Sequence, residues 1–309
     1  MKNGKSRKSS IFKYFEPVDI FGAIQDGSPD QHTIDEGLGY FAFSPQKKQL
    51  FLNRLSVNEI LDIAKKVGLT DHLASRGFEE LRVEIERDET MIHYLKIYDR
   101  DVSPVNLLID LRLSESRFIP DEKLFISKRG TTTLDMIVIE WLSAENPKNR
   151  FDPTKPLLPG QKKPGLGCLN FLMEMMYIVG KAVIKDGFMD IPDHMHGAIM
   201  YSRKFQFFDP VQEAILRAII RDMEGYSLQD ITWGMITGNI LDKATGLPQP
   251  YKPAEQIYTL SGRLKKYFNS STYKNRFKEV YKKKQYIFNY EQMIEKRNEI
   301  LKNKELVDI

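Results

Sequence analysis

The sequence predicts an α/β protein in which helices flank a mixed, mainly antiparallel sheet and a helical extension follows at the C-terminus. Three observations predict this fold class. The run Leu134–Leu142 (LDMIVIEWL) is short, β-branched and apolar, which is typical of a strand buried on both faces. The run Cys168–Ala182 is too long for an average strand and rich in Leu and Met, which favours a largely buried helix. From Pro210 onward the apolar residues recur mainly at helical spacing.

Composition sets the outer bounds on the kind of protein. The chain has 309 residues, 41% of them hydrophobic, which is enough for one large domain or two of ordinary size. No run approaches the roughly 18 apolar residues that a membrane span requires, and the basic segment Met1–Phe15 lacks the apolar stretch of a secretory signal. The single cysteine, Cys168, excludes an internal disulfide and suits a reducing compartment. We therefore expect a cytoplasmic protein in which Cys168 is a buried structural thiol.

Three segments are expected along the chain. Residues 1–35 are polar and should be largely disordered. Residues 36–210 carry both helical and strand-like patterns and should form the α/β domain. Residues 211–309 should form a helical, basic extension, interrupted by a Pro-rich linker at Leu247–Pro253.

The α/β domain should begin with two helices and a group of strands. Ser56 and Glu59 have the spacing of a capping box, so a helix is expected to start there and to run through Val67. A second, short helix is expected near Thr70–Ser75. Strand-like runs then follow one another closely enough to form an antiparallel meander: Leu81–Glu86, Ile92–Tyr98 and Val105–Leu113.

The segment Leu158–Gly167 (LPGQKKPGLG), between the apolar strand and the buried helix, carries the first functional signal. Glycines at such a junction bring bare backbone N–H groups to the helix N-terminus, where these groups and the helix dipole can hold an anion. A phosphate-bearing ligand is therefore the first hypothesis. The alternative is a tight turn that only starts a helix.

The two common nucleotide motifs do not fit this segment. Gly160 and Gly165 have Walker A spacing, but Leu166 and Gly167 stand where Lys and Ser or Thr are required. A Rossmann fingerprint needs a third glycine where Asn170 stands. A Gln/Lys-x-x-Gly-x-Gly pattern remains, and it resembles the pyrophosphate loop of the GNAT superfamily of N-acetyltransferases.

The order of the following elements adds to that resemblance. After the helix comes a short strand at Lys185–Pro192, and then a short helix with Tyr201 followed by an aromatic strand, within His196–Phe208. This order is similar to the acetyltransferase core from its fourth to its sixth strand, and the resemblance covers residues 80–210 at most. The chain departs from the family in its long Pro-rich loop at 142–161 and in the residues Phe205 and Gln206, where the family has a glycine.

The resemblance implies an enzyme that moves an acyl group directly from acetyl-CoA, or another acyl-CoA, to an amine, without a metal. It also implies that the glycine loop holds the co-substrate. A backbone N–H on the strand at Leu142 would stabilise the oxyanion. The residues assigned to the loop site are Gln161, Lys162, Lys163, Gly165, Leu166 and Gly167.

Three side chains are candidates for proton transfer. Glu140 interrupts an apolar strand, so burial should raise its pKa and suit it to act as a base, or it is a structural carboxylate. Tyr201 stands where the family often has the acid that protonates the departing thiolate, or it only packs. His196 could line the acceptor pocket and move a proton near neutral pH, or be an ordinary loop histidine. The run Asp193–His196 has no third metal ligand at a recognisable spacing, so no metal is expected.

The C-terminal region supports an alternative of a different class. The net charge is +4, yet from Ser261 onward about 13 Lys and Arg face about 6 Asp and Glu. Basic segments with interleaved aromatics can bind nucleic acid, and a non-catalytic protein could use these helices as its working surface. The favoured interpretation is that the rings pack on the core and the charges are solvated, because the apolar residues recur at near-helical spacing: Tyr267, Phe268, Tyr273, Phe277, Val280 and Tyr281.

Overall fold

The computed structural model describes residues 49–121, 124–125, 133–152, 157–159 and 161–303. The chain divides into two compact units, residues 1–46 and residues 47–309. The whole first unit, with the segment 1–35 expected to be disordered, lies outside the described residues, as does Gly160. Everything below concerns the second unit.

The two N-terminal helices form as their sequence predicts. Helix α1 (Val57–Lys66) begins in a capping box, in which the Ser56 side chain accepts from the Glu59 N–H and the Glu59 carboxylate accepts from the Ser56 N–H at 2.7 Å. Helix α2 (Leu69–Ala74) follows Gly68, whose φ of +80° is left-handed backbone that suits glycine. Both helices bury apolar side chains against the sheet.

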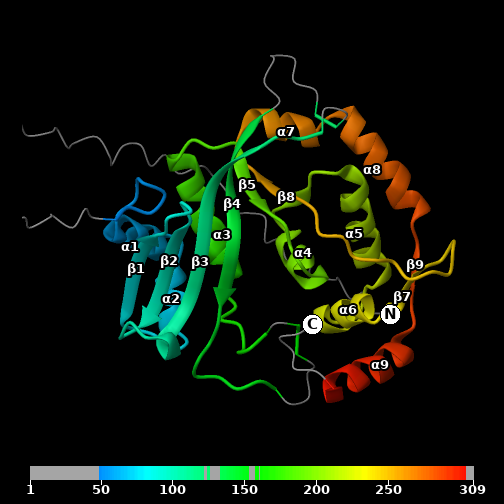
Figure 1. Cartoon of the computed structure of the whole chain (residues 1–309), viewed down its shortest axis with the longest axis horizontal. Helices are drawn as coiled ribbons and strands as arrows, with labels where there is room; N and C mark the ends of the chain where they lie inside the picture. The colour runs from blue at the N-terminus through cyan, green and yellow to red at the C-terminus, as the bar shows by residue number, and fades with distance from the viewer. Residues whose placement is uncertain (1–48, 122–123, 126–132, 153–156, 160, 304–309) are drawn as a thin grey trace, which may run out of the picture. The chain divides into compact units, whose positions relative to one another are not determined.

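The first half of the sheet is the predicted antiparallel meander. Strands β1 (Leu81–Arg87), β2 (His93–Asp99), β3 (Leu107–Phe118) and β4 (Leu134–Ala144) pair in sequence order, with a short helical turn η2 (Pro104–Asn106) before β3. Figure 1 shows α1 and α2 on one face of these strands. That face holds the largest apolar cluster, to which all four strands contribute.

A helical crossover then changes the strand pairing from antiparallel to parallel. Helix α3 (Leu169–Ala182) packs on the same face as α1 and leads to β5 (Gly187–Asp190), which runs parallel to β4. Helix α4 (Met195–Tyr201) and the two-residue strand β6 (Gln206–Phe207) follow. The predicted order of strand, glycine loop, helix, strand, Tyr-bearing helix and aromatic strand is confirmed.

The sheet is completed by a strand that the sequence pattern does not predict. Strand β8 (Gln256–Thr259) lies between β5 and β6 and is antiparallel to both. Within the described residues the sheet has seven strands, in the order β1-β2-β3-β4-β5-β8-β6. It is therefore mixed and mainly antiparallel, as expected. The region after residue 210, expected to be helical, thus also contributes a strand to the sheet, and four residues are too few to show an alternating pattern in the sequence.

The remaining C-terminal elements pack against this sheet and against one another (Figure 1). Strands β7 and β9 form a separate antiparallel pair. No helix among the described residues is long and apolar enough to cross a bilayer. The elements are α5 (Pro210–Asp222), α6 (Leu228–Ile236), β7 (Ile240–Asp242), α7 (Gly262–Phe268), α8 (Ser271–Lys283), β9 (Tyr286–Phe288) and α9 (Tyr290–Asn303).

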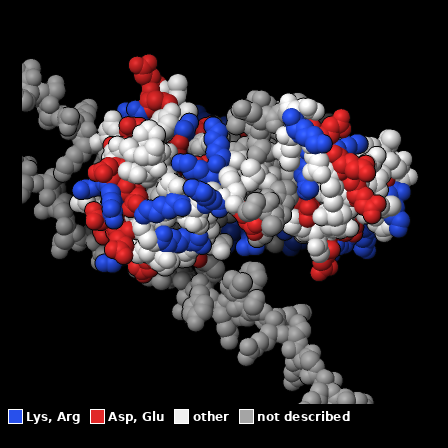
Figure 2. Space-filling view, turned by 90° about the horizontal axis from the view of Figure 1, so that it is seen from below, with Lys and Arg blue, Asp and Glu red and all other residues white. Residues whose placement is uncertain are grey.

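The basic helices use their aromatic side chains for packing. Tyr267, Phe268 and Tyr273 are buried in the apolar cluster on the sheet face opposite α3. The Tyr267 and Tyr273 hydroxyls donate to backbone carbonyls of Phe208 and Phe207, each at 2.7 Å. On the face shown in Figure 2, Lys and Arg side chains lie among Asp and Glu side chains. The expectation that the rings pack inward is confirmed for these three, whereas Phe277 and Tyr281 are half-buried and stack on each other at 5.4 Å.

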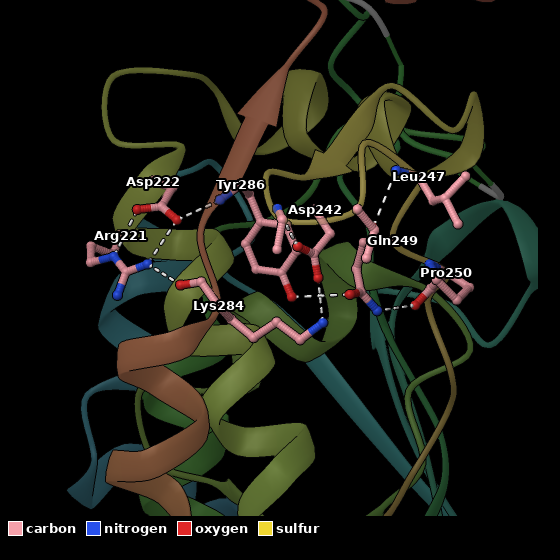
Figure 3. A network of polar contacts seen from close by, with 10 residues as sticks. Arg221, Asp222, Asp242, Leu247, Gln249, Pro250, Lys284 and Tyr286 are labelled. Carbon is pink, nitrogen blue, oxygen red and sulfur yellow. Dashed lines mark hydrogen bonds and ion pairs between the residues drawn. The ribbon is translucent and has the colours of Figure 1, made fainter.

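A polar network fastens α8 and β9 to α5 (Figure 3). Arg221 donates to the carbonyls of Tyr281 at 3.0 Å and Lys284 at 2.7 Å, at the C-terminal end of α8. Asp222 pairs with Arg221 and accepts from the Tyr286 N–H at 2.8 Å. Lys284 in turn forms an ion pair with Asp242 of β7. The C-terminal helices are therefore held by directed contacts as well as by apolar burial.

Candidate functional site

The parallel strands β4 and β5 pair over only part of the length of β4. Their registered pairs end at Val138 and Met189, whereas β4 continues to Ala144. A bulge lies just beyond the last pair, since Leu113 faces Ile139 and Arg112 faces Trp141, which leaves Glu140 as the extra residue. A bulge bends its strand and increases the local twist. No described strand pairs with this side of β4 beyond Val138, and we call this interruption of the pairing between β4 and β5 the gap.

The glycine loop lies at the far end of this gap. The Leu166 N–H donates to the Ala144 carbonyl at 3.0 Å, and the Asn146 N–H donates to the Pro164 carbonyl at 2.7 Å. These two bonds dock the loop against the end of β4. Gly165 and Gly167 are exposed, and Gly167 has a φ of +69°, which suits glycine.

The loop leads directly into an uncapped helix. Cys168 occupies the N-cap position of α3 and its side chain caps no backbone N–H. The first-turn N–H groups of α3 therefore have no side-chain cap, and they carry the positive end of the helix dipole. Burial raises the pKa of the Cys168 thiol to about 11, so this cysteine is a neutral structural group, as the sequence predicts.

Basic side chains lie beside the loop, and one of them carries no signal in the sequence. A Cβ atom placed on Gly167 would lie 3.2 Å from the Arg76 guanidinium, which is exposed at the end of α2. Lys162 is exposed and Lys163 half-buried. Gln161 is engaged within the loop, because its side-chain oxygen accepts from the Leu158 N–H at 3.3 Å. Arg76 reaches this site only through the fold, so no local motif could have indicated it.

The backbone of β4 offers hydrogen-bonding groups to the gap. The Ala144 carbonyl points away from β3, toward the loop, while the Glu145 N–H points to β3. Backbone groups alternate along a strand, so Leu142 directs its N–H and C=O to the same side as Ala144. No described strand pairs with Leu142 on that side. Among the described strands, none therefore takes up the N–H and C=O of Leu142 on the side of the gap.

A buried polar pair lies where β5 ends. Asp190 is the last residue of β5 and faces Gln256 of β8 in the register of the sheet, with exposed fractions of 8% and 0%. The Gln256 Nε2 donates to the Ala198 carbonyl of α4 at 3.1 Å. Its Oε1 and the Asp190 Oδ2 have no hydrogen-bond partner among the described residues. Burial, reinforced by the nearby Asp193 charge, raises the pKa of Asp190 to about 7.

Tyr201 adjoins this pair. Burial, and after it the charge of Asp190, raises the pKa of Tyr201 above its ordinary value. Its ring packs on Phe205 with a centroid distance of 5.2 Å. The raised pKa keeps the hydroxyl protonated and makes it a hydrogen-bond donor, while full transfer of its proton becomes less favourable than from an ordinary phenol. Tyr201 therefore lies near the buried Asp190 carboxylate and also packs against Phe205.

Glu140 does not occupy the buried position that the sequence predicts. It is exposed, and the Ser114 hydroxyl donates to its carboxylate at 2.5 Å. Ser114 alternates with the core residue Leu113, so Glu140 lies on the sheet face away from α3. Trp141 beside it is 52% exposed. The expected burial of Glu140 is wrong because the bulge turns the side chain to solvent. Burial of both faces of the strand is confirmed up to Ile139, since Met136 and Ile137 are buried in the clusters on opposite faces.

His196 lies in the first turn of α4, two residues after the N-cap residue His194. Burial, with the neighbouring His194, lowers the pKa of His196 to about 4. The Nδ1 atom is buried without a partner among the described residues. His196 is therefore neutral near pH 7. Within the described part of the chain, no three His, Cys, Asp or Glu side chains are arranged to hold a metal.

The glycine loop, the free edge of β4 and the Asp190 pair all belong to one end of the parallel strands. In open, mostly parallel α/β sheets ligands bind beyond the carboxyl ends of the strands, and β4 and β5 are the parallel pair of this mainly antiparallel sheet. Ala144 lies six residues after Val138, which is roughly 20 Å of extended chain. A ligand reaching from the loop to Asp190 would therefore be long and narrow. No family model, curated protein or solved structure matches the chain.

Proposed function

We propose that this protein is an acyl-CoA-dependent N-acyltransferase with an acyl-CoA N-acyltransferase-like fold. The observation that carries the proposal is the interrupted pairing of β4 and β5, with the glycine loop docked at the end of β4 and the buried Asp190 at the end of β5. The order of its elements agrees with the resemblance to the GNAT superfamily. Acyl-CoA has the matching chemistry, with a pyrophosphate at one end, a thioester at the other and an extended arm between them.

Each part of the co-substrate has a counterpart in the gap. Arg76, Lys162 and Lys163, with the N–H groups at the start of α3, would hold the pyrophosphate. The amides of the arm would pair with the free edge of β4 as an added strand does. Leu142 stands two residues from Ala144, where the loop docks, so its N–H suits an amide of the arm better than the thioester carbonyl.

The reaction end of the gap lies at the carboxyl end of β5. There the Tyr201 hydroxyl would donate a hydrogen bond to the sulfur of the departing thiolate. The lowered pKa of His196 makes it a poor proton acceptor near pH 7, so its Nδ1, which has no partner among the described residues, would accept a hydrogen bond from the acceptor substrate instead. Glu140 faces the other side of the sheet, so we assign it no part in the transfer.

The alternative of a nucleic-acid-binding protein loses its main support. Stacking on bases requires exposed rings, whereas Tyr267, Phe268 and Tyr273 are buried. Part of the basic surface is also neutralised, since Glu279 pairs with both Arg276 and Lys283. No observation favours this second function.

The test is a thermal-shift titration with acetyl-CoA, CoA and desulfo-CoA on the wild type and on Gly165→Glu. A ligand that binds only the folded state raises Tm with its concentration. A Cβ on Gly165 would meet only the Ala144 carbonyl, at 3.8 Å, so the variant is expected to fold. The matched control is Gly262→Glu, which adds the same charge where no atom lies within 4 Å.

We expect all three ligands to raise the Tm of the wild type and of Gly262→Glu, and to leave Gly165→Glu unchanged. No rise for the wild type at millimolar CoA would overturn the proposal. An equal rise in Gly165→Glu would remove the loop from it.

A further inference from the structure

The pair of Asp190 and Gln256 presents two buried acceptors without a donor. The Gln256 amide is oriented by its Nε2, which donates to the Ala198 carbonyl, so the atom left over is Oε1, an acceptor only. An ionised Asp190 also only accepts, and its Oδ2 is free among the described residues. Residues that face each other across antiparallel strands have Cβ atoms about 5 Å apart. Burying two such acceptors side by side is costly unless something donates to both.

The surroundings favour a cationic donor. No described Lys or Arg pairs with Asp190, and the neighbouring Asp193 is a second, exposed carboxylate. Burial, and after it the Asp190 charge, raises the pKa of both Tyr201 and Tyr251. The Tyr251 hydroxyl donates to the Pro192 carbonyl at 2.6 Å. Aromatic rings beside a carboxylate stabilise an organic cation further.

The histidines that follow do not supply this charge. Burial and the stacked ring of His194 lower the pKa of His196, so His196 is neutral. The groups around Asp190 therefore add negative charge or none.

We propose that Asp190 and Gln256, flanked by Tyr201 and Tyr251, bind the ammonium group of a primary amine. An ammonium group has three N–H donors, enough to satisfy the Asp190 Oδ2 and the Gln256 Oε1 together. One part of the inference rests on the proposed function: the bound amine is taken to be the acyl acceptor. It would bind where the gap between β4 and β5 ends.

The proton steps of the transfer then have named atoms. The Asp190 carboxylate takes one proton from the ammonium and later releases it to water. The freed nitrogen lone pair forms a bond to the thioester carbon, and the carbon–sulfur bond breaks to release the thiolate. A second proton leaves the nitrogen and ends on the thiolate sulfur. A pKa of about 7 suits Asp190 to this exchange near neutral pH.

A structural explanation competes with this one. A protonated Asp190 could donate to the Gln256 Oε1 and close the pair without any ligand. That arrangement predicts no affinity for amines at any pH.

The experiment measures thermal shifts of the full chain, without CoA, using n-butylamine as the probe at pH 6 and pH 8. n-Butanol controls for the alkyl chain, and tetramethylammonium controls for positive charge without N–H donors. Of the three compounds, we expect only n-butylamine to raise the Tm. Its affinity should be about tenfold weaker at pH 6 than at pH 8, because Asp190 is mostly protonated at pH 6.

Two variants locate the effect. Asp190→Asn keeps the shape and removes a buried charge, so it should fold and lose the shift. Asp193→Asn changes the same residue type at an exposed position, and it should keep the shift and move its pH midpoint downward. An equal shift in Asp190→Asn, an equal shift with either control compound, or none in the wild type at pH 8 overturns the inference.

A parallel desulfo-CoA titration separates the two proposals. Binding of desulfo-CoA without any amine shift overturns the amine site and leaves the acyl-CoA proposal standing. An amine shift without CoA binding supports the amine site and overturns its role as an acyl acceptor site.

Discussion

Asp190 is buried at the end of β5, whereas Asp193, in the turn that follows, is exposed. Burial raises the pKa of Asp190 from 3.8 to about 7, so the folded protein holds this proton more tightly than the unfolded chain does. Below pH 3.8 the group is protonated in both states and burial carries no charge penalty. Stability therefore falls as the pH rises from 3.8 to about 7, and the whole penalty is present above that range.

Asp190→Asn should consequently stabilise the protein more at pH 8 than at pH 5. The difference between the two pKa values corresponds to about 4 kcal/mol over the whole pH range as an upper bound, of which about 3 kcal/mol falls between pH 5 and pH 8. Urea denaturation at both pH values measures it, with Asp193→Asn as the control that should change little. An equal effect of Asp190→Asn at pH 5 and pH 8 would show that the carboxylate is not desolvated.

Arg76 is the residue on which anion binding at the loop can be tested most directly. Its guanidinium lies beside Gly167 and is exposed, so Arg76→Ala should leave the fold intact. Loss of one charge-assisted hydrogen bond, worth about 1.5 kcal/mol, should weaken CoA binding about tenfold. Calorimetric titration with CoA measures the change, and Lys66→Ala on α1 removes an exposed positive charge elsewhere. Equal affinities for both variants would contradict the assigned role of Arg76.

At the scale of elements, Arg221 joins the ends of two helices that are far apart in the sequence. Arg221→Met should destabilise the protein by roughly 2–3 kcal/mol, because two backbone carbonyls of α8 and the Asp222 carboxylate lose a charged partner. Arg276→Met removes an exposed ion pair on α8 and should cost about 0.5 kcal/mol or less. Urea denaturation compares them, and similar losses would mean that the network in Figure 3 contributes little.

The elements also show which parts of the fold a sequence can predict. The capping box of Ser56 and Glu59 is a local signal, and α1 begins there. Strand β8 exists because Gln256–Thr259 pairs with β5 and β6, and partners so distant leave no trace in four residues. Glu140 interrupts an apolar run, which reads as a buried carboxylate, although the cause is a bulge defined by its pairing with β3.

The candidate site also combines residues that the sequence signals with residues that only the fold brings together. The glycine loop was visible as a motif, and its place before a buried helix is confirmed. Asp190 stood in the sequence as an acidic residue ending an apolar strand, a signal that could have drawn notice. Gln256 and Arg76 became part of the site only through the fold, since β8 and α2 bring them there.

For the whole molecule, the position of β8 decides whether residues 211–309 can be removed. This strand lies between β5 and β6, and α7 and α8 cover one sheet face with buried aromatics. A chain of residues 1–210 would expose both strand edges and that apolar face, so it should not unfold cooperatively.

Helix α9 is attached differently, mainly through Met293 and the ion pair of Arg297 with Asp230. A chain of residues 1–289 should therefore keep a cooperative transition at a lower Tm and still respond to CoA. Calorimetry of both truncated chains tests the expectation. Cooperative melting of residues 1–210 would mean that the sheet is stable without β8, and that the region after residue 210 is a separate extension after all.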